Sequence, residues 1–238
     1  MQTTALPDSG FGLAGRERCP ESSGGRLSAV LLCTSETEGT NNSNEPAPPM
    51  PIPKLNGSGL VPPCRQAPTR PEDAAPYETT MLEICREFGG TPERRRVLAG
   101  LLELRAALRV INPGSGFQWV AGEFFVPDSA SRPHPACVSV VTFCQPGAGR
   151  GGPEVAALAR VLRCRRETLR RWLVDHVPVL LSYQPHLLVR QAHGCAGMLG
   201  HQRGTGAWQG VLCVDLGADD SSVVDWLLAA APAAAVGV

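Results

Sequence analysis

Lysine is almost missing from this 238-residue chain, in which Lys54 stands beside 21 arginines. Aromatic residues make up 5% of the chain, and the acidic and basic side chains cancel to a formal net charge of zero. A chain without net charge has no overall field that would steer it to nucleic acid or to a membrane surface, so any such binding must be local. We therefore expect neither nucleic acid nor a membrane as a partner.

Paired cysteines and long apolar runs are missing as well. The nine cysteines are scattered, and no two of them have the CxxC spacing of many metal and redox sites. An odd, scattered set fits a reducing compartment better than a disulfide framework. No run reaches the roughly 20 apolar residues that span a bilayer, and the run 27–33 is too short for the core of a signal peptide. These absences predict a cytoplasmic protein.

The composition changes near residue 50. Residues 1–50 are rich in glycine, serine, proline and asparagine, and they bury too little apolar surface to offset chain entropy, so we predict a disordered N-terminal extension. Met50 stands just before the body, which raises the hypothesis that translation starts there. With 43% hydrophobic residues in the chain, the body at 51–230 has enough to build a core. We expect residues 231–238 to form a disordered tail.

Helix and strand signals alternate through the body. Thr91 has the chemistry of a helix N-cap, Pro92 suits the first helical position, and apolar residues from Val97 to Leu108 recur at helical spacing. We predict helices over 77–88, 91–111 and 219–230, one or two helices over 153–173, and strands over 117–121, 138–143, 174–181 and 208–216. This pattern favours an α+β fold, with a short mixed sheet flanked by helices.

Several segments between Pro51 and about Leu228 carry a resemblance to a known family. They include Ile52-Pro53-Lys54-Leu55-Asn56-Gly57, Phe88-Gly89-Gly90-Thr91-Pro92, Ser115-Gly116-Phe117-Gln118-Trp119, Cys137-Val138-Ser139-Val140-Val141-Thr142-Phe143 and His201-Gln202-Arg203-Gly204. On these residues the chain resembles an uncharacterised bacterial family of nucleotidyltransferase-like proteins, a domain of unknown function. The resemblance implies a nucleotidyltransferase-like fold.

The resemblance also implies where an active site would lie. Members of that family carry Asp-Gly-Ser-Phe after the first strand and Asp-Ile-Asp at the second, where this chain has Gly122-Glu123 and Cys137-Val138-Ser139. A third family carboxylate matches Asp175. The implied roles are nucleotide binding at Gly122 and Glu123, and metal binding and catalysis at Asp175.

The substituted positions lack the chemistry of nucleotidyl transfer. Acids at positions i and i+2 of a strand share one face and can hold two divalent cations on a triphosphate. Cys137 and Ser139 are poor ligands for magnesium, which prefers carboxylate oxygens. Where a Gly-Ser pair would offer a hydroxyl and backbone N–H groups to phosphate, Glu123 would repel it. Cys137 and Ser139 are therefore degenerate metal positions.

Two functions compete. The first is a degenerate nucleotidyltransferase-fold protein, a pseudoenzyme that needs no cofactor and binds a nucleotide or a protein partner. The alternative is an active enzyme that moves a nucleoside monophosphate to a hydroxyl acceptor. It would hold magnesium through a rearranged site of Asp175 with Glu123 or Asp128. The departures at Glu123, Cys137 and Ser139 favour the first, and a gene that is losing its function remains a third possibility.

Two further patterns have both a functional and an ordinary explanation. Residues 154–171 carry six arginines against two glutamates, which could grip phosphates or simply form a solvated helix face. His134, Cys137 and Cys144 could be soft metal ligands, but their spacing matches no standard zinc pattern. Unrelated loop and core residues explain this trio better.

The remaining candidate residues are better explained by packing in the core than by a catalytic role. His193 and Cys195 alternate as on a strand and could pair a thiol with a base, but an inert buried cysteine is the better interpretation. We expect all four tryptophans in the core. They are Trp119, Trp172, Trp208 and Trp226.

Overall fold

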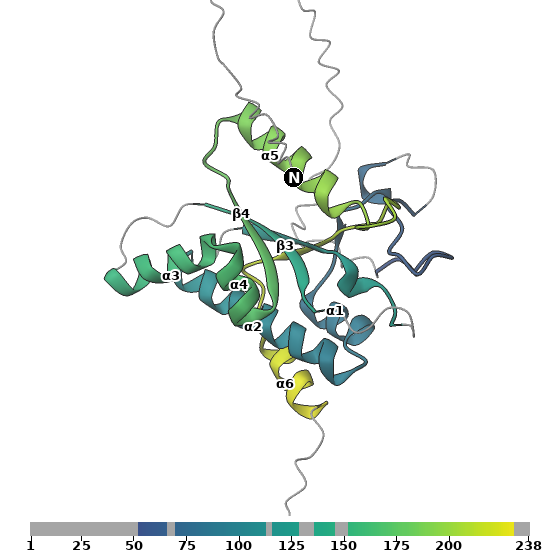
Figure 1. Ribbon diagram of the computed structural model, residues 1–238, viewed down its shortest axis with the longest axis horizontal. Helices are drawn as coiled ribbons and strands as arrows, with labels where there is room; N and C mark the ends of the chain where they lie inside the picture. Colours follow the sequence, from purple (N-terminus) through teal and green to yellow (C-terminus); the bar gives the residue numbers. More distant parts are fainter. Residues whose placement is uncertain (1–51, 66–69, 113–115, 129–135, 146–151, 231–238) are drawn as a thin grey trace, which may run out of the picture. The chain divides into compact units, whose positions relative to one another are not determined.

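The computed structural model describes residues 52–65, 70–112, 116–128, 136–145 and 152–230, which form an α+β fold (Figure 1). The predicted extension at 1–50 and the tail at 231–238 lie outside the described residues. The elements are η1 (Pro71–Asp73), β1 (Tyr77–Glu78), α1 (Met81–Phe88), α2 (Pro92–Ile111), β2 (Gly116–Ala121), η2 (Glu123–Phe125), β3 (Val138–Cys144), α3 (Pro153–Arg163), α4 (Arg165–Trp172), β4 (Val174–Leu180), α5 (Pro185–Leu199), β5 (Leu212–Asp215) and α6 (Ser221–Ala229).

Helix α2 begins where the side-chain chemistry places a start. Thr91 Oγ1 accepts a hydrogen bond from the backbone N–H of Arg94 at 3.3 Å, and Pro92 occupies the first turn. The apolar side chains from Val97 to Leu108 that recur at helical spacing are buried. Their burial against the sheet, more than intrinsic propensity, stabilises this helix.

The described strands form one mixed sheet in the order β1-β5-β2-β3-β4. Strand β2 pairs antiparallel with both β5 and β3, whereas β4 runs parallel to β3 and β1 runs parallel to β5. The prediction of a mixed sheet flanked by helices is confirmed at this level. Strand β4 lies at one edge and contains Pro178, and the two-residue β1 lies at the other.

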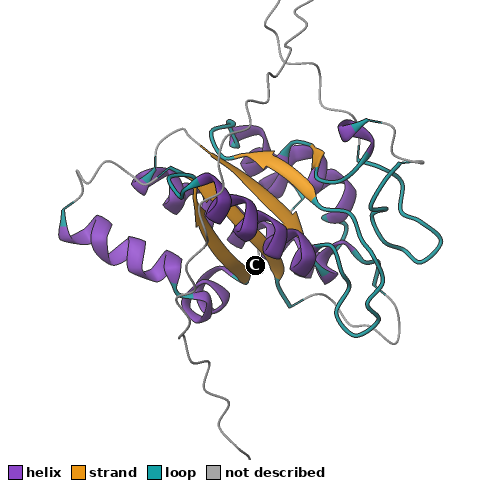
Figure 2. Cartoon of the chain, turned by 90° about the horizontal axis from the view of Figure 1, so that it is seen from above, coloured by secondary structure: helices purple, strands orange, loops and turns teal. Residues whose placement is uncertain are grey.

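Side chains that alternate along each strand divide between two faces of the sheet. One face, which includes Val120 and Val140, packs on α1, α2, α3, α4 and α6 in the main hydrophobic core. The opposite face, which includes Phe143, packs on Cys195 and Leu199 of α5. Figure 1 shows α5 across the strands from α2 and α4, and Figure 2 shows helices lying along the strands.

A series of hydrogen-bonded, buried polar groups crosses the face of the sheet that packs in the main hydrophobic core. Arg105 pairs with Asp220 at 2.7 Å and donates to Gln118 Oε1 at 2.8 Å. Gln118 Nε2 donates in turn to Thr142 Oγ1 at 3.0 Å, and that oxygen lies 2.9 Å from His176 Nε2. Because these polar groups have hydrogen-bond partners, the core tolerates their burial.

One or two helices are predicted over 153–173, and the structure has two, α3 and α4, divided at Cys164, whose backbone is extended. Three other predicted elements differ from the structure. The helix predicted over 77–88 begins only at Met81, and Tyr77–Glu78 form strand β1. The strand expected over 208–216 is limited to Leu212–Asp215. His193 and Cys195 lie on helix α5 rather than on a strand, so residues two apart do not share a face there.

The tryptophans differ in burial, so the expectation that all four are core residues is wrong for one of them. Trp172 is buried, and Trp119 and Trp226 are partly buried against the two hydrophobic clusters. Trp208 is 64% exposed because it lies in the loop before β5 rather than in a strand. None of the helices described is long and apolar enough to cross a membrane.

Candidate functional site

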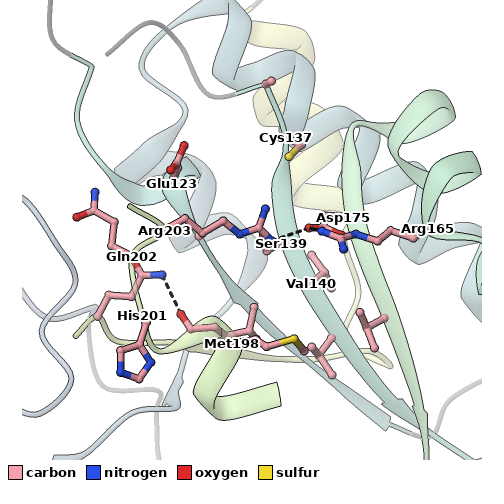
Figure 3. Close-up of a pocket in the computed structure, with 16 residues that line it drawn as sticks. Glu123, Cys137, Ser139, Val140, Arg165, Asp175, Met198, His201, Gln202 and Arg203 are labelled. Carbon is pink, nitrogen blue, oxygen red and sulfur yellow. Dashed lines mark hydrogen bonds and ion pairs between the residues drawn. The ribbon is translucent and has the colours of Figure 1, made fainter. Parts of the chain in front are cut away.

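A pocket of about 250 Å³ opens on the α5 side of the sheet (Figure 3). Its walls come from the turn after β2, from β3 and β4, from the start of α4, and from the end of α5 with the loop that follows it. Five lining residues are those singled out from the sequence: Gly122, Glu123, Cys137, Ser139 and Asp175.

The strand register explains why these positions meet. Ala121 of β2 pairs with Ser139 of β3, and Ser139 pairs with Asp175 of β4. Paired residues on neighbouring strands lie on the same face, and such strands are about 4.8 Å apart. Cys137 precedes Ser139 by two residues and lines the same pocket. The fold therefore brings together the three positions at which we expected family carboxylates, and only Asp175 is acidic.

Gly122 makes room at the end of β2. Its φ of 103° is a conformation that glycine adopts readily and other residues rarely. A Cβ atom at this position would lie 3.0 Å from Ser139 Oγ, so any larger residue would crowd the serine. Glu123 follows at the start of η2 and lines the pocket.

Asp175 is only 6% exposed and binds two arginines (Figure 3). Arg165 donates to both carboxylate oxygens, from Nε to Oδ1 and from Nη2 to Oδ2. Arg203 Nη2 donates to Oδ2 at 3.1 Å. A two-pronged contact between arginine and carboxylate is among the stronger hydrogen-bond geometries in proteins. Both oxygens of Asp175 are therefore already bonded to guanidinium groups.

The two arginines reach Asp175 from separate parts of the chain. Arg165 is the first residue of α4, which packs on the opposite face, and its side chain passes around the edge strand β4. Arg203 lies in the loop after α5, where the Gln202 backbone N–H donates to the Ala207 carbonyl at 2.8 Å. The pocket thus depends on the placement of both α4 and α5.

The arginines retain donors for a further ligand. Each guanidinium carries five N–H groups, and Asp175 accepts two from Arg165 and one from Arg203. Within the described part of the chain, Asp175 is the hydrogen-bond partner of both groups, and their side chains are 56% and 70% exposed. Two positive charges against one negative charge leave these three side chains with a surplus positive charge, and the carboxylate of Glu123, which also lines the pocket, offsets it.

The thiol of Cys137 is not activated. Burial raises its pKa, the negative charge of Asp175 raises it further, and Arg203 opposes the shift only in part. The thiolate is the form that attacks electrophiles and binds metals, so a thiol kept protonated does neither well. Burial also raises the pKa of Cys144 and of Cys195, and His134 lies outside the described residues.

A divalent metal ion does not fit the donors that are present. In the ranges that the structure describes, no group of three or more His, Cys, Asp or Glu side chains could hold a metal ion. Magnesium needs oxygen ligands, and the oxygens of Asp175 are bonded to Arg165 and Arg203. Asp128 pairs with Arg94 at 2.8 Å and does not line the pocket, so it offers no second carboxylate there.

Neither Arg165 nor Arg203 was predicted from the sequence as a site residue. Arg165 is one of six arginines over 154–171, and only its place just after the break at Cys164 distinguishes it. Arg203 could not be placed without α5. Two signals for that helix were available, because proline is common at the first helical position and glycine just after the end, as at Pro185 and Gly200.

Comparison with protein families places the pocket inside a family region. The model of a family of unknown function, DUF6932, matches residues 53–215, a range that includes every residue lining the pocket. No curated protein and no solved structure matches the chain. The expectation of an uncharacterised domain is confirmed, and the nucleotidyltransferase likeness stays a prediction.

Proposed function

Since the chain belongs to DUF6932, a family of unknown function, we propose its function from the pocket itself. The protein binds a small phosphate-bearing molecule, such as a nucleotide, without a metal ion and without transferring a nucleotidyl group. In this proposal it is a degenerate nucleotidyltransferase-like domain whose pocket still binds a ligand but no longer catalyses nucleotidyl transfer.

The observation that carries the proposal is the bonding of Asp175 to Arg165 and Arg203. In a metal-dependent transferase, cations beside the aspartates neutralise the phosphates of the substrate. Here two guanidinium groups supply positive charge at the corresponding place. Arginine is well suited to this task because its planar fork matches the geometry of phosphate oxygens.

The same observation weighs against the active alternative. A magnesium ion at Asp175 would lie beside the guanidinium groups of Arg165 and Arg203, and these two positive charges would repel it. Cys137 and Ser139 offer no carboxylate to offset that repulsion, and among the residues that the structure describes Glu123 is the one other acidic side chain in the pocket lining. Because paired catalytic metals are held by several carboxylates about 4 Å apart, one or two acids do not supply such a site.

Calorimetric titration of the full chain tests the proposal. We expect both ATP and inorganic tripolyphosphate to bind in the presence of EDTA, and excess magnesium to weaken binding by competing for the phosphates. Replacing Arg203 with glutamine should weaken both ligands about tenfold or more, since a hydrogen bond to a charged group contributes about 1.5–3 kcal/mol. Arg165→Gln should do the same.

Arg166→Gln is the matched control, because Arg166 is exposed, neighbours Arg165 on α4 and does not line the pocket. This variant should bind both ligands as the natural chain does. Binding that requires a metal and disappears in Asp175→Asn would support the active enzyme instead. If neither ligand binds under any condition, the proposal fails, and capture of a protein partner becomes the next experiment.

A further inference from the structure

Trp208 is 64% exposed and does not itself line the pocket, but it precedes Gln209 and contacts His201, which both do. Its ring lies against that of His201, with centroids 4.1 Å apart and planes tilted by 49°. Large aromatic side chains usually bury most of their surface. An exposed tryptophan next to a pocket is therefore a feature that packing alone does not explain.

The backbone and His201 hold this aromatic pair in place. His201 and Trp208 form an antiparallel bridge, and the loop between them is closed by the hydrogen bond from Gln202 N to Ala207 O at 2.8 Å. His201 Nδ1 lies 2.7 Å from the carbonyl oxygen of Gly197, which fixes the imidazole ring. An ordered, exposed ring offers a flat surface to a ligand at little cost in side-chain entropy.

The same loop carries Arg203, which donates to Asp175. His201 and Arg203 both line the pocket and are two residues apart, so their Cα atoms are at most about 7 Å from one another. Met198, at the end of α5, also lines the pocket and is 62% exposed. One side of the pocket is therefore positively charged, and the side next to it is apolar and aromatic.

We propose that Trp208, with His201, is the stacking surface for the base of a nucleotide whose phosphates bind Arg203 and Arg165. This inference rests on the proposed function and makes it more specific, because it names a planar ring joined to an anion as the ligand. The ring of Trp208 contacts His201, and His201 and Arg203 line the same pocket, so a base on Trp208 would lie on the side of the pocket that carries Arg203. Stacking needs no hydrogen-bond pattern, so the site discriminates little between bases.

The test compares a ligand that has a base with one that lacks it. Calorimetry on the full chain in EDTA measures the dissociation constants of ATP and of inorganic tripolyphosphate for the natural chain, Trp208→Ala and Trp208→Phe. A stacked base adds binding that alanine removes, so Trp208→Ala should weaken ATP between about five- and a hundredfold. Trp208→Ala should leave the affinity for tripolyphosphate unchanged, and Trp208→Phe should recover most of the affinity for ATP.

Fluorescence provides a second readout, because Trp208 is the most exposed tryptophan that the structure describes. ATP should quench the emission of the natural chain and tripolyphosphate should not. In Trp208→Phe the quenching should disappear although ATP still binds. Tyr183→Ala is the control, since Tyr183 is a 41% exposed aromatic residue in the turn between β4 and α5, outside the pocket lining and outside the loop of His201 and Trp208, and it should change the binding of neither ligand.

The possible failures can be told apart. If tripolyphosphate binds but Trp208→Ala leaves ATP unchanged, or weakens both ligands equally, the stacking surface is refuted and the phosphate site stands. If the natural chain binds neither ligand, the proposed function fails and this inference fails with it.

Discussion

Placing aspartates at Cys137 and Ser139 should give the pocket a divalent-metal site. Ser139 is the register partner of Asp175, and Cys137 lines the same pocket, so the double variant Cys137→Asp/Ser139→Asp would set three carboxylates on one face. Two unit charges at the strand spacing of about 4.8 Å repel by about 3 kcal/mol at an effective dielectric constant of about 20. Arg165 and Arg203 offset part of this repulsion.

We therefore expect the metal-free double variant to lose about 2 kcal/mol of stability, which corresponds to a fall in Tm of about 4–8 °C for a domain of this size. Adding Mn²⁺ or Mg²⁺ at a hundred times its Kd should raise the free energy of unfolding by about 2.7 kcal/mol, because the metal binds only the folded chain. Thermal denaturation followed by fluorescence, with EDTA or with metal, measures both effects.

The control is Cys137→Asn/Ser139→Asn, which has side chains of the same shape without the charge and should show no response to metal. The reasoning is refuted if the aspartate variant folds, as judged by circular dichroism, and its Tm does not rise with either metal. A metal-dependent Tm in the natural chain would refute the separate argument that its donors do not fit a metal ion.

Replacing Asp175 with asparagine should preserve or strengthen metal-free tripolyphosphate binding in calorimetry, because the carboxylate competes with phosphate for the guanidinium groups; a complete loss would contradict this. Arg105→Met should lower the free energy of unfolding in urea by about 2 kcal/mol, since it leaves Gln118 Oε1 without its donor while Asp220 keeps its ion pair with Arg109, and a change below about 1 kcal/mol would show that Arg105 is not needed. Burial lowers the pKa of His176 in the folded chain to about 4, so the unfolded chain binds a proton at this residue at a higher pH than the folded chain does. The stability that neutral His176 contributes is therefore complete above about pH 6.5 and falls as the pH drops toward 4. Urea titrations at pH 7 and pH 5 should show this loss, and His176→Gln should reduce it.

The elements that position the pocket floor were predictable because each has a strong local pattern. Helix α2 has both a capping threonine and a buried stripe, and β2, β3 and β4 are mostly apolar stretches of strand length. The side-chain period of two then places Cys137 and Ser139 on one face from the sequence alone. That Asp175 lies beside them required the resemblance, because strand order is not a local property.

The pocket walls formed by the start of α4, the end of α5 and the loop after it were not predictable from local sequence patterns. Helix α5 is mostly exposed, so its apolar periodicity is weak, and the alternation around His193 and Cys195 imitates a strand. The contact between Arg165 and Asp175 depends on β4 being an edge strand, around which a side chain can pass. Trp208 sits in an apolar context in the sequence, and its exposure follows from a loop that ends only at Val211.

Neither edge of the described sheet is a good template for adding a strand from another molecule. Pro178 has no N–H group, so β4 cannot present an unbroken row of donors along its outer side. At the opposite edge β1 is two residues long, which leaves little backbone for intermolecular pairing. Short edges and edge prolines are devices that keep native sheets from aggregating. Copies of this chain should therefore not assemble edge to edge, even at high concentration.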